Sequence, residues 1–165
     1  MSLSIFSLPS AERYFEDYVA GSIYEYGPAS VDASEAYRFI KQFGPGFSQA
    51  GEKMSPNREP GSTVANEWHV MGIMMRLFVE GFLPSRASIA SPGVDDIHWL
   101  KSVRAGDSLR IRITIVEARL SQSKPDRGFV RVLMETFNQY GELVLSLKSM
   151  NLIRCRTDGD AHPRS

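Results

Sequence analysis

Hydrophobic and polar residues alternate through much of the second half of the chain. In SLRIRITIVEARL, residues 108–120, apolar side chains occupy every second position and polar ones lie between them: Leu109, Ile111, Ile113 and Ile115 against Arg110, Arg112 and Thr114. Successive side chains of a strand point to opposite faces of its sheet. The pattern therefore predicts a strand with one buried face.

Further strands are indicated on both sides of this one. GFVRVLMETFNQ (128–139) and LVLSLKSMNLI (143–153) follow it, separated by the turn sequences SKPDRG and NQYGE. DDIHWLKSV (95–103) precedes it, and the apolar residues around 23–31 indicate a short strand near the start. Since short turns join antiparallel neighbours, the last four strands are predicted to form a meander.

A first helix is predicted over residues 31–43, VDASEAYRFIKQF. Asp32 followed three residues later by Glu35 is a capping-box pattern, which satisfies the free amides of a first helical turn. Apolar residues recur at helical spacing: Ala36, Phe39, Ile40 and Phe43. The sequence Gly44-Pro45-Gly46 ends the helix.

A second, longer helix is predicted over residues 62–83, STVANEWHVMGIMMRLFVEGFL. One apolar stripe runs along it, and further apolar residues widen that stripe: Val64, Trp68, Met71, Met75 and Phe78, with Ala65, Ile73, Leu77 and Phe82. A helix that is apolar over most of its circumference is typical of a protein interior. We therefore expect this helix to be buried, with the strands curling around it.

One buried helix and a meander of long strands predict a single α+β domain, with an antiparallel sheet wrapped around the helix. This arrangement is the hot-dog fold. We place the domain at residues 14–155, with an N-terminal arm at 1–13 and a disordered tail at 156–165.

Composition narrows the classes of function. The 165 residues carry no formal net charge, which disfavours a nucleic-acid or anionic-membrane partner. The single cysteine excludes an internal disulfide and a cysteine metal cluster, and it favours a cytoplasmic location. The three histidines are not spaced for a metal site. No apolar run approaches the roughly 20 residues of a membrane span.

Several phrases resemble the MaoC-like dehydratases, hot-dog proteins related to (R)-specific enoyl-CoA hydratases. The similarity covers about residues 14–154 and includes YFEDYVAG (14–21), EWHVMGIMMRLFVEGFL (67–83) and, most specifically, SPGVDDIHWLKSVRAGD (91–107). The resemblance implies a homodimer, or a larger dimer-based assembly, that acts on acyl-CoA thioesters without a further cofactor. The hydratases of the family add water across a 2,3 double bond, or remove it.

The family's Asp-x-x-x-x-His signature falls here on Gly44 and Gln49. Residues 43–62 contain neither Asp nor His, so a shift of the alignment does not restore the pair. Glycine has no side chain, and glutamine orients water without accepting its proton. We expect the Gly- and Pro-rich stretch 43–61 to be a flap over the acyl-thioester cleft, without the usual acid–base pair.

The resemblance places the thioester at the start of the long helix, where backbone N–H groups stabilise developing negative charge. Glu67 is then a candidate replacement base or nucleophile, with Gln49 orienting the substrate; the alternative is that Glu67 only favours the positive helix end. The residues expected around the substrate are Val64, Ala65, Asn66, Trp68 and His69.

Other candidates carry weaker signals. Glu52 is a further carboxylate in the 43–61 stretch, and His69 is as well explained by packing in the core. Lys101, Arg104, Arg86 and Arg127 are possible contacts for CoA phosphates. Three functions stay open: a hydratase or dehydratase with altered chemistry, a thioesterase based on Glu67, and a non-catalytic acyl-CoA-binding or structural subunit.

Overall fold

The computed structural model describes residues 2–44 and 64–157. Its elements follow in chain order: 3-10 helices Ser10–Glu12 and Phe15–Asp17, β1 Ile23–Ser30, α1 Ala33–Phe43, α2 Glu67–Gly81, β2 Ser88–Trp99, β3 Ser108–Leu120, β4 Arg127–Phe137 and β5 Leu143–Arg154. The predicted strand near residues 23–31, both helices and the three C-terminal strands are confirmed.

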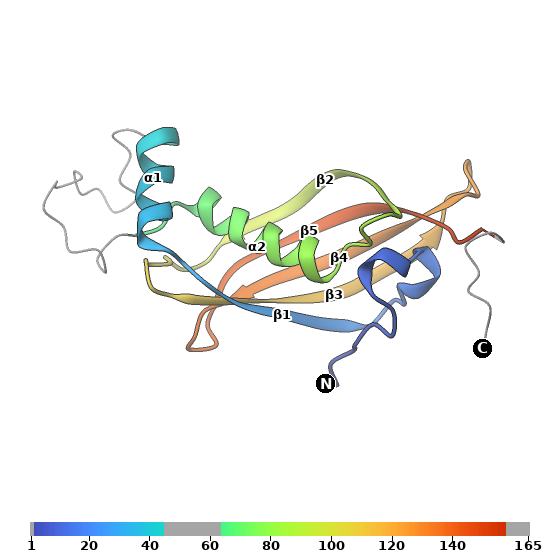
Figure 1. Ribbon diagram of the computed structural model, residues 1–165, viewed down its shortest axis with the longest axis horizontal. Helices are drawn as coiled ribbons and strands as arrows, with labels where there is room; N and C mark the ends of the chain where they lie inside the picture. Colours follow the sequence, from blue (N-terminus) through green and yellow to red (C-terminus); the bar gives the residue numbers. More distant parts are fainter. Residues whose placement is uncertain (1, 45–63, 158–165) are drawn as a thin grey trace, which may run out of the picture.

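The five strands form one antiparallel sheet in the order β1-β3-β4-β5-β2. Figure 1 shows α2 lying along one face of this sheet, with α1 at the end where α2 begins and the two 3-10 helices near the other end. This is the predicted α+β hot-dog architecture.

The core lies between α2 and the sheet. The inward residues of β3 are fully buried, as the alternating pattern predicts: Leu109, Ile111, Ile113 and Ile115 each have 0% exposure. Val70, Ile73, Met74, Leu77 and Phe78 form the facing side of α2. Burial of each such side chain stabilises the fold by about 1.5–3 kcal/mol.

The position of β2 differs from the predicted meander. It starts at Ser88, before the predicted range of 95–103, and it pairs with β5 rather than with β3. The reason is competition for β3, whose free side is taken by β1 through pairs such as Tyr24 with Ile113. β2 is therefore an edge strand, and nearly every residue in it is exposed.

The long helix also differs from its prediction in start and burial. α2 starts at Glu67, after Asn66, whose side-chain Oδ1 accepts the N–H of Trp68 at 2.9 Å. Trp68 is 57% exposed and Met75 is 41% exposed, so these two residues of the predicted stripe, unlike Phe78 of the same stripe, do not face the core. With Val79 they form an outward apolar face at helical spacing.

The N-terminal arm is packed against the domain. The Phe6 ring lies 4.3 Å from that of Tyr24 and 5.7 Å from that of Phe82, because the end of α2 leaves an aromatic surface there. Arg156, the first residue of the predicted tail, forms a 2.8 Å ion pair with Asp17. The rest of that tail, from 158, lies outside the described residues.

Candidate functional site

The start of α2 presents backbone N–H groups. The first amides of any helix lack intrahelical acceptors. Here Asn66 accepts from Trp68 through its side chain and from Val70 through its carbonyl. Within the described part of the chain, the N–H groups of Glu67 and His69 have no acceptor. With the helix dipole, they make this end favourable for an oxyanion.

A cavity of about 150 Å³ opens beside this helix end. α2 contributes Glu67 and Val70, and the segment after β2 contributes Lys101 and Ser102. Val144 of β5 is buried at 1% exposure and lines the cavity from the sheet. The cavity thus combines a carboxylate, a hydroxyl and an ammonium group with an apolar wall.

Glu67 lies at the first position of α2, and its half-buried side chain lines this cavity. It does not point into the core. A carboxylate here accepts stabilisation from the helix dipole.

The preceding residues Val64 and Ala65 hold the start of α2 against the loop after β2. Ala65 donates its N–H to the carbonyl of Val103 at 2.8 Å, and Val64 forms an isolated bridge with Arg104. Ala65 lines the cavity at 2% exposure. These contacts fix the helix start relative to Lys101 and Ser102.

His69 lies on another side of α2 from Glu67. Its imidazole stacks on Phe39 of α1 with 5.4 Å between ring centroids, and it is not among the residues that line the cavity. Burial lowers the pKa of His69 from its ordinary 6.5, with smaller opposing effects of Glu35 and Asp32. Its buried Nδ1 has no hydrogen-bond partner among the described residues.

Trp68 does not line the cavity either. It lies at the surface, in contact with Trp99 of β2, which does line it. The described structure therefore brings together Ala65 and Glu67 at the cavity, with Asn66 as helix cap, and leaves Trp68 and His69 on other sides of the helix.

The positions of the family's Asp and His are only partly described. Gly44 is the C-cap of α1, and its N–H donates to the carbonyl of Ile40 at 2.9 Å. Gln49, Glu52 and the predicted flap lie outside the described residues.

Among the candidate phosphate contacts, Arg104 is held beside the segment that leads into α2, since its backbone forms a bridge with that of Val64. Lys101 is paired with Glu142, and Arg127 is paired with Asp126 at 2.8 Å. Arg86 follows the far end of α2. Arg104 is therefore the most available of the four.

Sequence reasoning missed Trp99, Ser102 and Val144 as cavity residues. Trp99 and Ser102 belong to the stretch predicted as a strand, whose second half is in fact a connection. The sequence did not mark Val144 as a cavity residue, because a buried valine in β5 is equally well explained by packing in the core.

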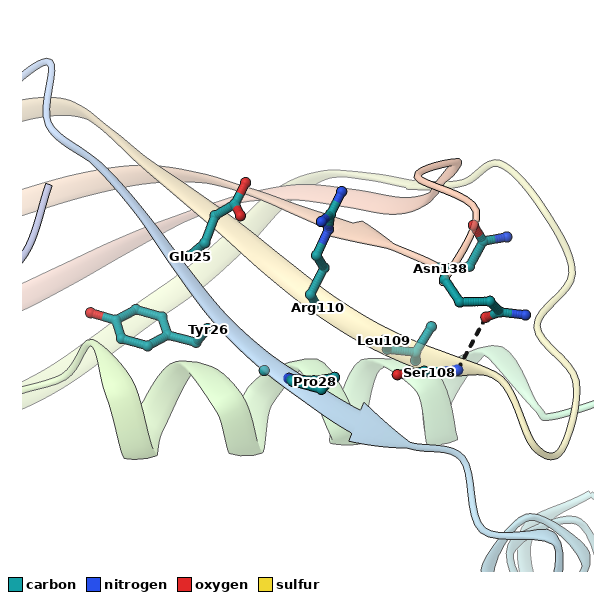
Figure 2. Close-up of a pocket in the computed structure, with 9 residues that line it drawn as sticks. Glu25, Tyr26, Pro28, Ser108, Leu109, Arg110 and Asn138 are labelled. Atoms are coloured by element: carbon teal, nitrogen blue, oxygen red, sulfur yellow. Dashed lines mark hydrogen bonds between the residues drawn. The ribbon is translucent and has the colours of Figure 1, made fainter. Parts of the chain in front are cut away.

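A larger pocket of about 320 Å³ lies at the bulge between β1 and β3. Figure 2 shows Glu25 and Arg110 projecting there on the side of the strands away from α2. Several of its polar groups already have partners: Glu25 pairs with Arg112 at 2.7 Å, and Gln139 accepts the N–H of Ser108 at 3.1 Å. We therefore place the candidate site at the start of α2.

Within residues 2–44 and 64–157, no group of three or more His, Cys, Asp or Glu side chains is arranged to hold a metal ion. None of the described helices is long and apolar enough to cross a membrane.

No protein-family model matches the chain, and no curated protein sequence matches it. Several solved structures are similar to the chain. A MaoC-like dehydratase from Rhodospirillum rubrum is 27% identical, with a TM-score of 0.73, over 88% of this chain and 99% of that one. A monoamine oxidase regulatory protein from Archaeoglobus fulgidus is 25% identical, with a TM-score of 0.70, over 88% and 96% of the two chains.

A Mycobacterium tuberculosis protein described as having a double hot-dog fold shares the fold at a TM-score of 0.74 and 18% identity. The match covers 94% of this chain and 48% of that one, so this chain corresponds to about half of the double unit. Together with the architecture described above, these neighbours show that the chain has the hot-dog fold and is similar to MaoC-like dehydratases.

Proposed function

We propose that the chain is a hydratase or dehydratase relative that acts on acyl-CoA thioesters at the start of α2, with altered acid–base chemistry. The observation that carries this is the pair of N–H groups of Glu67 and His69, which have no acceptor among the described residues, at the helix end beside a cavity in a hot-dog fold. Such donors stabilise the negative charge that develops on a thioester oxygen.

Glu67 is the proposed acid–base residue. Gly44 has no side chain, and Gln49 cannot accept a proton from water near neutral pH. Glu67 is the carboxylate that lines the cavity beside the amides. It takes a proton from water attacking carbon 3 and returns one to carbon 2.

Hydration of crotonyl-CoA tests this proposal. Glu67→Gln removes the base while keeping the shape, so turnover should fall by about 10²–10⁴-fold. Glu80→Gln is the matched control, since Glu80 is an exposed residue of the same helix and does not line the cavity. Turnover that Glu67→Gln leaves unchanged would remove Glu67 from the chemistry.

A thioesterase is the second candidate, favoured by Glu67 lining the cavity next to the amide side chain of Asn66. Glu67 then activates water, or attacks the thioester carbon itself, and free CoA leaves as a thiol. Thiol release from acyl-CoA that Glu67→Gln abolishes, without hydration of crotonyl-CoA, would select this function.

A non-catalytic acyl-CoA-binding subunit is the third candidate, supported by the absence of a side chain at Gly44. Acyl-CoA would then raise the melting temperature by binding linkage while no product forms.

Arg104 is proposed to contact a phosphate of CoA, because it is exposed and bridges the residue that leads into α2. Arg104→Gln should raise KM with kcat unchanged, since the contact is equally strong in ground and transition states. A change in kcat alone would contradict this role.

We further propose a homodimer. β2 is a sheet edge with both faces exposed, and the neighbouring outward face of α2 carries Trp68, Met75 and Val79. An exposed edge strand and a contiguous apolar face are features of protein interfaces. The double hot-dog neighbour contains a second such unit in its own chain, which supports a second copy as the partner here.

A further inference from the structure

Arg13 is a buried cation at the opposite end of α2. It is 5% exposed, and its Nη1 donates to the carbonyls of Gly81 and Phe82, both at 3.0 Å. Its guanidinium lies 4.3 Å from the centroid of the Phe6 ring. These contacts leave the Nε–H buried and without an acceptor among the described residues.

The charge of Arg13 also lacks a carboxylate partner within the described residues. Two acidic residues near it are paired with other arginines: Asp17 pairs with Arg156, and Glu25, which lines the adjoining pocket, pairs with Arg112. The carbonyls at the end of α2 compensate the charge only partly. A buried charge without a counter-charge is costly, and proteins pair such groups.

A pocket of about 280 Å³ adjoins this guanidinium. Its polar lining includes Ser4, Tyr24, Tyr26 and Glu25, whose carboxylate pairs with Arg112, and its apolar lining includes Phe6 and Leu8. Ser4 Oγ accepts the N–H of Ile23 at 3.3 Å, so its own hydroxyl proton is available to another acceptor. The pocket therefore has a cationic, hydroxyl-bearing side and an apolar side.

The tyrosines supply donors rather than negative charge. Burial raises the pKa of Tyr26 to about 12, and burial also raises the pKa of Tyr24. Both phenols are therefore protonated at neutral pH. A ligand that completes this arrangement brings the negative charge itself and accepts hydrogen bonds.

We propose that this pocket binds a small organic carboxylate with a short apolar tail. The carboxylate accepts from Arg13 and from the hydroxyls of Ser4 and Tyr26, and the tail packs on Phe6 and Leu8. Arg–carboxylate contacts are among the stronger hydrogen bonds in proteins. α2 separates this pocket from the candidate thioester site by about 22 Å, at about 1.5 Å of rise per residue.

Titration with butyrate, against its neutral isostere butyramide, tests the proposal. Chemical shifts and the melting temperature of the full chain should change saturably with butyrate and not with butyramide. Tyr26→Phe keeps the ring and removes one donor, so butyrate affinity should fall about ten-fold. Tyr140→Phe is the matched control, because Tyr140 is 78% exposed and lies in the turn between β4 and β5, outside this pocket.

Leu8→Trp fills the apolar side without touching the cation and should abolish binding. The Leu8→Trp variant also distinguishes binding in this pocket from binding of a carboxylate at the thioester site. Glu67→Gln, which changes the thioester site, should leave butyrate affinity unchanged. Absence of saturable binding, equal binding of butyramide, or binding that Leu8→Trp leaves intact would each overturn the proposal.

Discussion

The indoles of Trp68 and Trp99 meet edge to face, with 5.5 Å between ring centroids and 66° between ring planes. This contact joins the start of α2 to the end of β2, on the surface rather than in the core. Trp68 remains 57% exposed and Trp99 39% exposed. Two large aromatic side chains this accessible, beside a sheet edge, are the basis of the interface proposed above.

The first prediction concerns that surface. Val79→Glu places a charge in the outward face of α2, away from the cavity at the helix start, and should convert a dimer to monomers. Sedimentation equilibrium at several concentrations measures the change. Tyr140→Glu, on the turn before β5, should leave the dimer intact. A wild-type chain that is monomeric at every concentration would contradict the proposed interface.

The second prediction concerns the missing acid–base pair. Gly44→Asp combined with Gln49→His restores the family's residue types and should raise crotonyl-CoA hydration by about 10²-fold or more. Gly44 has φ −137°, and among the described residues an added Cβ would meet only the Ile40 carbonyl at 3.7 Å, so we expect the aspartate to be tolerated locally.

The matched control for the restored pair is Gly44→Asn with Gln49→His, which keeps the size and lacks the carboxylate. Equal hydration rates for the two double variants would show that the restored carboxylate does no chemistry.

The third prediction concerns His69 and pH. Burial lowers the pKa of folded His69 below 6.5, so the unfolded chain binds this proton at a pH where the folded chain does not. The contribution to stability is therefore complete above about pH 6.5 and is lost as pH falls through the lower folded value. His69→Phe, which keeps a ring against Phe39, should flatten the dependence of unfolding free energy on pH between about 6.5 and 5. Identical slopes in the two proteins would exclude His69 as the source.

The fourth prediction concerns Arg13 as an anchor of the arm. Arg13→Met removes two charge-assisted hydrogen bonds to the end of α2 and should lower the free energy of unfolding by about 1.5–3 kcal/mol. Urea denaturation measures the loss. Arg86→Met removes an exposed arginine just beyond the same helix and should change stability by less than about 0.5 kcal/mol. Equal effects of the two substitutions would show that the buried contacts of Arg13 contribute little.

The sequence was informative where a local pattern has one solution. The alternation around Ile111 and Ile113 predicts the buried face of β3, and Asp32 caps α1 as expected by accepting the N–H of Glu35 at 2.8 Å. The place of β2 depends on the pairing of β3, whose second side is occupied by β1. No local pattern records such a competition.

For a similar reason, the sequence could not show that one apolar face of α2 points away from the core. Trp68 and Met75 are as apolar as the core residues Ile73 and Phe78. In a sequence, apolar residues on an exposed helix face look the same as those packed in the core. The candidate site could be predicted only in part: the family resemblance pointed to Glu67, which lines the cavity, whereas the contribution of Val144 depends on how the sheet packs.

The central claim is that the start of α2 binds an acyl-thioester. The most direct measurement is a crystal structure of the Glu67→Gln variant with crotonyl-CoA bound. We predict that the thioester oxygen lies about 3 Å from the backbone nitrogen of residue 67 or of His69, with carbons 1 to 3 beside the side chain of residue 67. A thioester bound with its oxygen away from both nitrogens, or no bound crotonyl-CoA at saturating concentration, would contradict the claim.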